Sequence, residues 1–285
     1  MKRALRIVFL LIGAGSAALS FSCKATPCPD TIGPDGGVEK HPNCTQLQTT
    51  IEYTGTARTG SGKWATGQAI SITNVLGDVK VAADSPIADE VQISGTPFTR
   101  DTQDDTGKQS ATTRLGNMAS PTVTSDATSV VVKATGGGFD GYRLTVHIPS
   151  AFDGAITVNQ DTGDATLHSA TGAKSSTVHT GVGDITADNL TGTINLTSGN
   201  GKLTVSATPS GPGNVLQTDL GDINATIGMA NLMITAKTDF GGTVSFPATW
   251  TMQTLTPDKT GGSATIGDGS GALNATTKNG SIFFQ

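Results

Sequence analysis

A five-residue pattern recurs along the second half of the chain, beginning at Gly163-Asp-Ala-Thr-Leu167. Further copies are Gly183-Asp-Ile-Thr-Ala187, Gly201-Lys-Leu-Thr-Val205, Gly221-Asp-Ile-Asn-Ala225, Gly242-Thr-Val-Ser-Phe246, Gly262-Ser-Ala-Thr-Ile266 and Gly280-Ser-Ile-Phe-Phe284. The third and fifth positions are apolar in all seven copies, and the position between them is polar in six. Such alternation is typical of a strand that buries one face. The leading glycine suits a tight corner, because it adopts positive φ without a steric penalty.

The spacing of the copies predicts how they pack. Their leading glycines are 18 to 21 residues apart, and a period near this length indicates units that must stack to bury their apolar faces. A second set of strand-like segments lies between them: Gly154-Ala-Ile-Thr-Val158, Gly192-Thr-Ile-Asn-Leu196, Gly213-Asn-Val-Leu-Gln217 and Gly271-Ala-Leu-Asn-Ala275. We therefore predict an all-β fold, a β-solenoid with rungs of about 20 residues and two short strands each.

The N-terminus has the features of an export signal. Residues 1–22 combine a basic start with an apolar run from Ile7 to Leu19, which is too short for a membrane span. Leu19-Ser-Phe-Ser-Cys23 resembles a bacterial lipobox, although Phe21 is large where a small residue is usual. The resemblance implies lipidation of Cys23 and a membrane anchor, and the alternative is plain secretion. We expect an exported protein of the cell envelope, an outer-membrane lipoprotein on either the periplasmic or the surface side.

The remaining cysteines lie in a short segment that follows this site. Residues 23–50 are predicted to be a tether, in which Cys28 and Cys44 would form a disulfide in an oxidising compartment. A metal site formed with His41 is the alternative, but it would lack one ligand of a closed zinc site. Removal of residues 1–22 takes away three basic residues and no acidic ones, so the net charge becomes 15 − 23 = −8. This charge argues against nucleic acid as a partner.

Residues 51–285 are predicted to form the solenoid domain, irregular over 51–150 and regular over 151–285. The polar segment Thr99–Asp126 has no steady period and is predicted to be a mobile loop. The chain ends in the strand-like Phe283-Phe-Gln285, which predicts an open sheet edge where a partner or a second copy could dock.

Three longer segments carry a family resemblance: Ile70-Ser-Ile-Thr-Asn-Val-Leu-Gly-Asp-Val-Lys-Val81, Tyr142-Arg-Leu-Thr-Val-His-Ile-Pro149 and Thr180-Gly-Val-Gly-Asp-Ile-Thr-Ala-Asp-Asn-Leu-Thr-Gly192. Together they resemble a bacterial family of β-strand-repeat proteins that are usually labelled adhesins and are otherwise of unknown function. The likeness covers Ile51 to Gln285 and implies a β-solenoid in the cell envelope. It supplies no catalytic residues. The segment Thr99–Asp126 departs from the family, because it shows no helical or heavily charged character.

Acidic residues and histidines are the candidates for a metal or catalytic site. Asp164, Asp184 and Asp222 follow leading glycines, where a local turn role competes with calcium binding, and the acidic repeat typical of stacked calcium sites is absent from the sequence. Asp101, Asp104 and Asp105 are expected to lie in a solvated loop. The histidines at 41, 147, 168 and 179 are expected at the surface. We predict no metal, no cofactor and no catalytic residue.

Two further features are candidates for glycan binding. Thr166, Thr186 and Thr204 would form an outward column of hydroxyl groups, although threonine is common on exposed strands for structural reasons. Trp64 and Trp250 could stack on sugar rings, but Trp250 is expected to fill the interior or cover a rung. The sequence thus predicts a non-enzymatic envelope lipoprotein that acts as an adhesin or surface scaffold, with an envelope protein or a surface glycan as ligand. A polysaccharide-degrading enzyme is the alternative.

Overall fold

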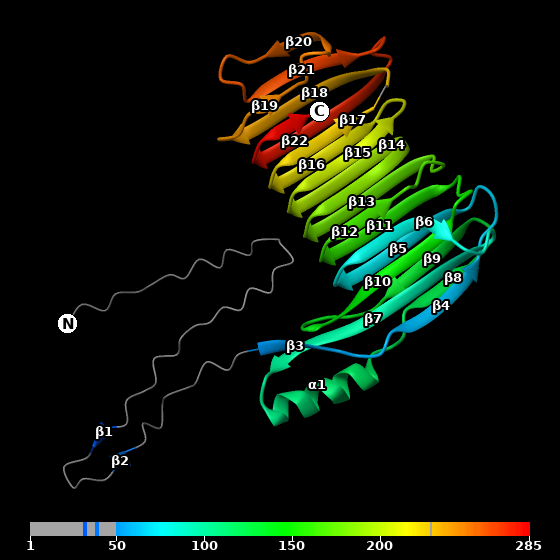
Figure 1. The fold of residues 1–285 in the computed structure, drawn as a ribbon, viewed down its shortest axis with the longest axis vertical. Helices are drawn as coiled ribbons and strands as arrows, with labels where there is room; N and C mark the ends of the chain where they lie inside the picture. The colour runs from blue at the N-terminus through cyan, green and yellow to red at the C-terminus, as the bar shows by residue number, and fades with distance from the viewer. Residues whose placement is uncertain (1–30, 33–37, 40–49, 229) are drawn as a thin grey trace.

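The computed structural model describes residues 31–32, 38–39, 50–228 and 230–285. Over these residues the fold is all-β with one helix, so the all-β part of the prediction is confirmed (Figure 1). The predicted signal peptide, the lipidation site Cys23 and the predicted disulfide partners Cys28 and Cys44 lie outside the described residues. In the predicted tether, the strands β1 (Thr31–Ile32) and β2 (Val38–Glu39) pair in an antiparallel arrangement.

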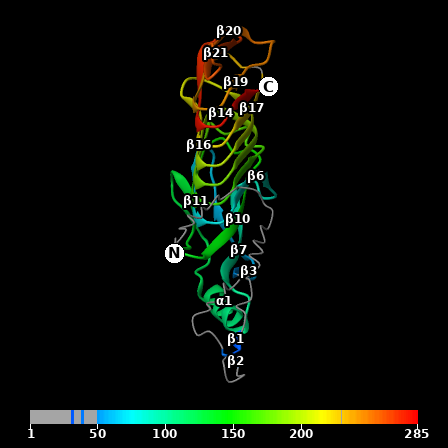
Figure 2. The ribbon, with the colours of Figure 1, turned by 90° about the vertical axis from the view of Figure 1, so that its left-hand side faces the viewer.

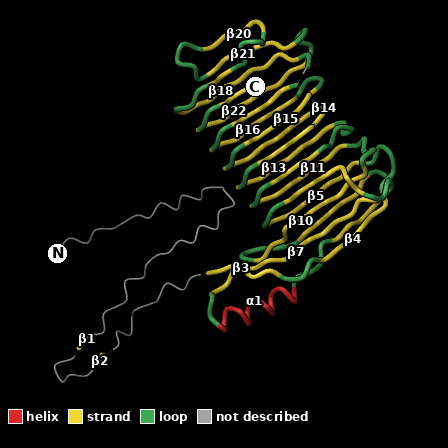
Figure 3. The backbone as a smooth tube through the Cα atoms, viewed as in Figure 1, coloured by secondary structure: helices red, strands yellow, loops and turns green. Residues whose placement is uncertain are grey.

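The first half of the main sheet contains eight strands and the helix. The strands are β3 (Thr50–Thr54), β4 (Arg58–Lys63), β5 (Ala69–Leu76), β6 (Val79–Ser85), β7 (Glu90–Thr102), β8 (Thr122–Ser125), β9 (Ser129–Ala134) and β10 (Asp140–Pro149). Helix α1 (Asp105–Asn117) connects β7 to β8 and lies at one end of the molecule (Figure 3). Among the residues that the structure describes, no helix is both long enough and apolar enough to cross a membrane.

The second half continues with shorter connections. Its strands are β11 (Ala155–Thr162), β12 (Ala165–His168), β13 (Ser175–Val182), β14 (Ile185–Asn200), β15 (Leu203–Pro209), β16 (Asn214–Leu220), β17 (Ile223–Ile227), β18 (Leu232–Phe240), β19 (Val244–Ser245), β20 (Thr251–Leu255), β21 (Gly261–Ile266), β22 (Gly271–Asn279) and β23 (Ile282–Phe284). Figure 2 shows that the described part is elongated and narrow when viewed from the side.

Two ladders of parallel strands run along the length of the molecule. The β5 ladder contains, in spatial order, β9, β5, β11, β13, the second half of β14, β16, β22 and β18. The β6 ladder contains β10, β6, β12, the first half of β14, β15, β17, β23 and β19. Each strand of the β5 ladder therefore has a sequence neighbour in the β6 ladder, and we call such a unit a strand pair.

A glycine starts the short corner within most strand pairs, as the sequence predicts. In the pair β13–β14, the corner is Gly183-Asp184 and Gly183 has a φ of 149°. Space restricts the corner further, because a Cβ atom on Gly183 would lie 1.8 Å from the carbonyl oxygen of Gly163 in the adjacent pair. Glycine is needed here because the corners of successive pairs are stacked in direct contact.

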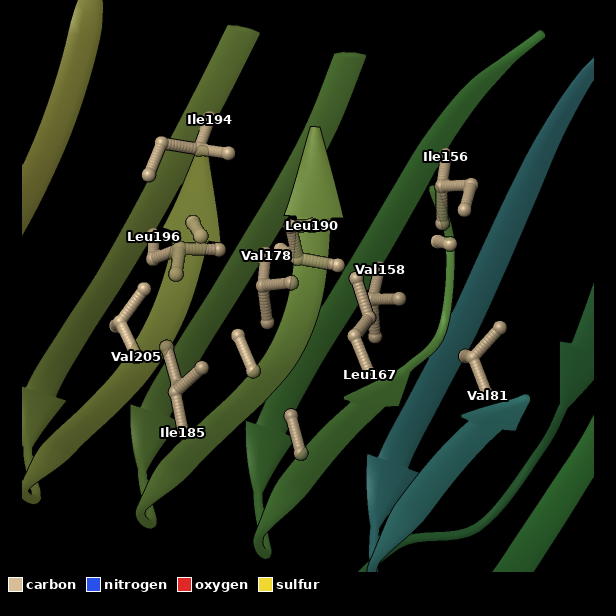
Figure 4. Close-up of a cluster of buried hydrophobic side chains, with 14 of the residues drawn as sticks. Val81, Ile156, Val158, Leu167, Val178, Ile185, Leu190, Ile194, Leu196 and Val205 are labelled. Carbon is tan, nitrogen blue, oxygen red and sulfur yellow. The ribbon is translucent and has the colours of Figure 1, made fainter. Parts of the chain in front are cut away.

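The core lies between the two ladders. The side chains of Ile156, Val158 and Val178 point from the β5 ladder toward Leu167 and Ile185 of the β6 ladder (Figure 4). The first predicted apolar column is buried throughout, and it contains Ala165, Ile185, Leu203, Ile223, Val244, Ala264 and Ile282. In the second column, Phe246 and Ile266 are only partly buried, whereas the other members are buried. The inward assignment of both columns is thus confirmed.

The strand pairs are not stacked in chain order at either end of the molecule. The pair β5–β6 lies between β9–β10 and β11–β12, and the pair β22–β23 lies between β16–β17 and β18–β19. The expectation of a regular coil to the last residue is therefore wrong. The copy Gly262–Ile266 does not form its own rung but lies in β21, which pairs antiparallel with β18.

The open edge of the sheet is also not where the sequence places it. Strand β23 pairs with β17 on one side and β19 on the other, so the prediction of an open edge at Phe283–Gln285 is wrong. Among the described strands, β8 at one edge of the sheet pairs only with β9, and β20 at another edge pairs only with β21. The register between β20 and β21 is interrupted between Thr251 and Thr254. Met252 has a φ of 47° at this irregularity. Bulges of this kind distort an edge and disfavour pairing with another chain.

The prediction of a mobile loop at Thr99–Asp126 is wrong, because the segment contains the end of β7, helix α1 and β8. The Asp104 carboxylate accepts a hydrogen bond from the Gly107 amide at 2.7 Å and caps the helix. Gly107 and Ala111 are buried, and Arg114 forms an ion pair with Asp101 at 3.0 Å. Small residues and ionic contacts hold the helix, so no apolar period reveals it in the sequence.

Candidate functional site

Two adjacent columns of outward side chains on the β5 ladder, followed from β5 to β18, form what we call the polar face. The first column is Ser71, Thr157, Thr177, Asn195, Val215, Asn274 and Thr235, and the second is Thr73, Asn159, His179, Thr197, Gln217, Thr276 and Lys237. Eleven of these fourteen residues carry a neutral hydroxyl or amide group, and none of the fourteen is buried. Lys237 is the one lysine among these fourteen residues and is paired with Asp239 at 2.6 Å. In β9 the two columns continue with Val131 and Lys133.

The polar face results from the alternation of the strands. Parallel pairing in register places equivalent residues about 4.8 Å apart along each column. In β11, for example, Ile156 and Val158 point into the core while Thr157 and Asn159 point outward. A flat array of neutral donors and acceptors can hydrogen-bond to a neutral hydroxylated polymer, and it offers little attraction to a charged one.

The hydroxyl column predicted from the sequence lies on the opposite ladder. Thr166, Thr186 and Thr204 are neighbours in register and point outward, as expected. The column continues through Asn224 to Phe283, so it loses its hydroxyl character toward one end. The wider polar face was missed, although the polar fourth residue of segments such as Gly154-Ala-Ile-Thr-Val158 is a sequence signal for it.

A third set of hydroxyl groups is buried and stabilises the stack. Thr180, Ser198, Thr218, Thr277 and Thr238 each donate to the carbonyl of the corner glycine in the adjacent strand pair, at 2.8 to 3.2 Å. These bonds satisfy carbonyls that are remote from water. The equivalent residue in β11 is Gln160, whose buried side-chain nitrogen and oxygen have no hydrogen-bond partner. The role of this buried set is structural.

The aspartates of the corners also link one strand pair to the next. The Asp164 carboxylate accepts a hydrogen bond from the backbone amide of Asp184 at 2.8 Å. In the next corner, the Asp184 carboxylate accepts one from the Lys202 amide at 2.7 Å. The Asp222 carboxylate likewise accepts one from the Ser281 amide at 2.7 Å. These contacts join adjacent pairs, whereas the sequence suggested hydrogen bonds within each turn. Among the described residues, no group of three or more potential ligand side chains is arranged to hold a metal ion.

Electrostatics at this edge follow from the stacking. Burial raises the pKa of Asp164, and the nearby charges of Asp78 and Asp184 raise this pKa further. The hydrogen bond from the Asp184 amide acts in the opposite direction but does not cancel the shift. The ionised form of Asp164 therefore destabilises the folded protein relative to its protonated form.

The structure separates the remaining candidate residues. His168 on β12 contacts the Asp188 carboxylate at 3.0 Å, whereas His179 lies on the polar face of the other ladder. His147 contacts Asp84 at 2.7 Å. Asp101 and Asp104 belong to the ion pair and the cap of α1, so their assignment to a solvated loop is wrong.

Neither tryptophan presents a free ring for a sugar. Trp64 is buried against Phe152, with ring centroids 5.5 Å apart. Trp250 lies 6.0 Å from Phe246 and 5.4 Å from Phe284, so these three rings cover one end of the core. The expectation that Trp250 covers a rung is confirmed.

Comparison with known proteins finds similarity in structure but none in sequence. No family model matches the sequence, and no curated protein matches it. Three solved structures are similar: a candidate cell adhesion protein from Clostridium sporogenes (10% identity, 80% of this chain and 99% of that chain covered, TM-score 0.44), a candidate adhesin from Bacteroides fragilis (12%, 81% and 97%, 0.26) and a candidate adhesin from Parabacteroides distasonis (10%, 81% and 98%, 0.26). With TM-scores below 0.5, these similarities carry no argument about the function of this chain.

Proposed function

We propose that this protein is an exported, lipid-anchored and non-enzymatic component of the cell envelope that presents its polar face for adhesion or scaffolding. The ligand that fits this face best is a neutral surface glycan. The observation that carries the proposal is the composition of the polar face, where eleven of the fourteen residues in its two adjacent columns carry neutral hydrogen-bonding groups. An envelope protein as ligand is the competing outcome.

We also propose that the architecture is a β-solenoid with rungs of two short strands. Support comes from the segment between Ala155 and Ile227, where successive strand pairs stack in chain order and in parallel register. A long stack of this kind offers a stiff, repetitive surface, as binding repeats do in other solenoid folds.

A glycan-binding assay tests the role of the polar face. Thr177→Glu combined with Thr276→Glu adds two charges to the polar face, and Thr186→Glu combined with Ser245→Glu adds the same two charges to the other ladder. We expect pull-down on insoluble neutral polysaccharides to fall at least tenfold for the first pair and to stay unchanged for the second. Equal binding by both variants, or no binding by the unmodified protein, would contradict the proposal.

The lipid anchor is tested separately. Metabolic labelling with a fatty acid should mark the unmodified protein and not Cys23→Ser, and protease treatment of intact cells should then report the side of the membrane. Removal of the protein from intact cells supports a surface adhesin. Protection until the outer barrier is broken would exclude adhesion to other cells and leave scaffolding within the envelope.

A polysaccharide-degrading enzyme remains the alternative, and the stacked carboxylates of Asp164 and Asp184 are the feature that favours it. The raised pKa of Asp164 beside a second carboxylate is the kind of asymmetry that acid–base pairs use. Both carboxylates already accept amide hydrogen bonds from the next corner, which a structural role explains. Hydrolysis of any polysaccharide that is lost in Asp184→Ala would favour the enzyme.

A further inference from the structure

A hollow of about 440 Å³ lies between the last turn of α1 and the junction of β3 with β4. Its wall includes Thr54, Thr56, Arg58, Pro97 and Leu115, and the wall contains no aspartate or glutamate. The volume lies in the range of small-molecule sites in proteins. It is separate from the polar face, since none of its wall residues belongs to the β5 ladder.

The hollow lies where Pro97 interrupts the pairing of β7 with β3 and β4, whereas the pairing of β7 with β10 continues through Pro97. Thr54 pairs with Phe98, and Arg58 pairs with Gly95. Between these pairs, residues 55–57 face only two residues of β7, Thr96 and Pro97. Proline has no amide hydrogen to continue the ladder. The chain therefore bulges outward between β3 and β4, and α1 lies across the bulge, where Leu115 faces Gly55.

Arg58 is the cationic group of this hollow. Its Nη1 donates to the Met118 carbonyl and to the Tyr142 hydroxyl at 3.0 Å, and its Nη2 donates to the Leu115 carbonyl at 2.8 Å. Capping of the helix C-terminus accounts for the bonds to Leu115 and Met118. Because a guanidinium group has five N–H donors, two of them remain on the half-buried side chain. No carboxylate of the described residues forms an ion pair with Arg58.

We propose that the hollow binds a small organic carboxylate, with Arg58 as its anchor. The unused donors are the N–H of Nε and one N–H of Nη2, and the Nε–Nη2 edge of a guanidinium group can hold a carboxylate in a bidentate pair. The hydroxyl groups of Thr56 and Thr112 would meet polar parts of the ligand, and Pro97 and Leu115 would contact its apolar part. The positive charge of Arg58 favours an anionic ligand, because the wall of the hollow carries no negative charge. The chain as a whole is acidic, so this wall differs in charge from the rest of the protein.

Binding of glucuronate, compared with glucose, tests the proposal on the full chain by titration calorimetry. The two probes share the sugar ring, and only glucuronate carries a carboxylate. N-acetylalanine serves as a second carboxylate and distinguishes an acidic sugar from a peptide end as the source. We expect at least one carboxylate to bind at millimolar concentration or below, and glucose to show no binding. Binding of glucose as strong as glucuronate, or no binding of either carboxylate, would overturn the proposal.

Variants of the hollow complete the test. Gly116 belongs to the wall, and a Cβ atom there would meet no atom within 4 Å outside its chain neighbours and the helix backbone, so Gly116→Leu adds bulk to the wall without a clash. Gly137 is equally open but lies outside the hollow, so Gly137→Leu is the matched control. We expect at least tenfold weaker carboxylate binding for Gly116→Leu and none of this loss for Gly137→Leu. Arg58→Met should abolish binding. If Arg58→Met does not fold, Gly116→Leu still tests the hollow, because it does not alter Arg58. Unchanged affinity in Gly116→Leu would overturn the proposal.

Discussion

At the scale of single residues, the stack is controlled by the corner glycines and the buried hydroxyls. The corners of adjacent strand pairs are so close that even glycines with ordinary φ have no room for a side chain. Gly201 is such a case, because its φ is not positive, yet a Cβ atom there would lie 1.9 Å from the Gly183 carbonyl oxygen. Close stacking of backbone on backbone is therefore the reason for the glycine repeat at this position.

Gly201→Ala should destabilise the protein strongly, because the added methyl group clashes with backbone that cannot move independently. We expect a loss of about 3 kcal/mol or more in the free energy of unfolding, measured by chemical denaturation. Gly137→Ala adds the same methyl group in open space, and its effect should stay within about 0.5 kcal/mol. Equal stability of the two variants would contradict the steric explanation.

Thr218→Val should show the value of the buried hydroxyls. The Thr218 hydroxyl donates to the Gly201 carbonyl at 2.8 Å, and valine would leave that carbonyl without this bond in the interior. The expected loss is about 1–3 kcal/mol of unfolding free energy. Thr204→Val makes the same change on the exposed side of β15 and should be close to neutral. The interpretation fails if both variants have the same denaturation midpoint.

Asp164→Asn should stabilise the protein at neutral pH. Since the folded-state pKa of Asp164 is raised, the folded state binds its proton more tightly than the unfolded state does. The free energy of unfolding therefore falls as the pH rises through the folded-state pKa of Asp164. Below the pKa of the unfolded state, near 3.8, this loss is absent. Asparagine can still accept the Asp184 amide. We expect a higher melting temperature than wild type at pH 7 and a difference that shrinks as the pH approaches 4.

Asp222→Asn is the control for this titration. Asp222 makes the equivalent amide contact with Ser281, but its neighbour in the stack is Lys202 instead of a second aspartate. Removal of its charge should not raise the melting temperature at pH 7. A gain as large as that of Asp164→Asn would show that net charge, and not the stacked carboxylates, causes the effect.

At the scale of elements, α1 is the part that departs most from the repeat. It is held by the Asp104 cap, by the close contact of Gly107 with Thr102 and by the ion pairs of Arg114 with Asp101 and Asp140. Because it forms one wall of the hollow with Arg58, its stability should also control the shape of that site.

Loss of the helix cap should loosen α1 selectively. Asp104→Ala removes the acceptor for the Gly107 amide and should cost about 1 kcal/mol. Hydrogen exchange should become faster for the amides of α1 and remain unchanged in β13 and β16. Asp153→Ala is a control, because the Asp153 carboxylate accepts from the Gly67 amide in a loop at a distance from the helix. Uniform loss of protection throughout the protein would contradict a local role.

At the scale of the whole molecule, the order of the strand pairs couples the two ends of the chain to the interior. In a stack that follows chain order, removal of the last unit exposes only one interface. Here the last pair, β22–β23, is in contact with β16–β17 on one side and with β18–β19 on the other. The first pair of the ladders in sequence, β5–β6, is enclosed in the same way.

A chain truncated after Ser270 should lose more than its last strand pair. Strands β22 and β23 are the link between β18–β19 on one side and β16–β17 on the other. Without them, β18 and β19 lose their parallel partners, and β21 is held only through its pairing with β18 and β20. We expect limited proteolysis to remove the truncated chain back to the region of β17. In the full chain, β18 should remain protected under the same conditions. Continued protection of β18 and β21 in the truncated chain would contradict the enclosed position of β22–β23.

The sequence alone predicts most of the strands, their inward faces and the glycine corners. These are local properties, because alternation such as Ile156-Thr157-Val158 places side chains on opposite faces of a strand whatever its neighbours are. The row of corner residues could also be predicted, since Asp164, Asp184 and Lys202 do stack in register.

Long-range packing, in contrast, sets which strand pairs are neighbours, where the edges of the sheet lie and how the hollow beside α1 forms. Every pair offers a similar backbone edge and a similar apolar face, so local patterns cannot show that β22–β23 enters between β16–β17 and β18–β19. Helix α1 carries no apolar stripe, because Gly107 and Ala111 are its buried residues. The hollow needs Pro97, Arg58 and Leu115 to meet, and these residues are brought together only by long-range strand pairing and the docking of the helix.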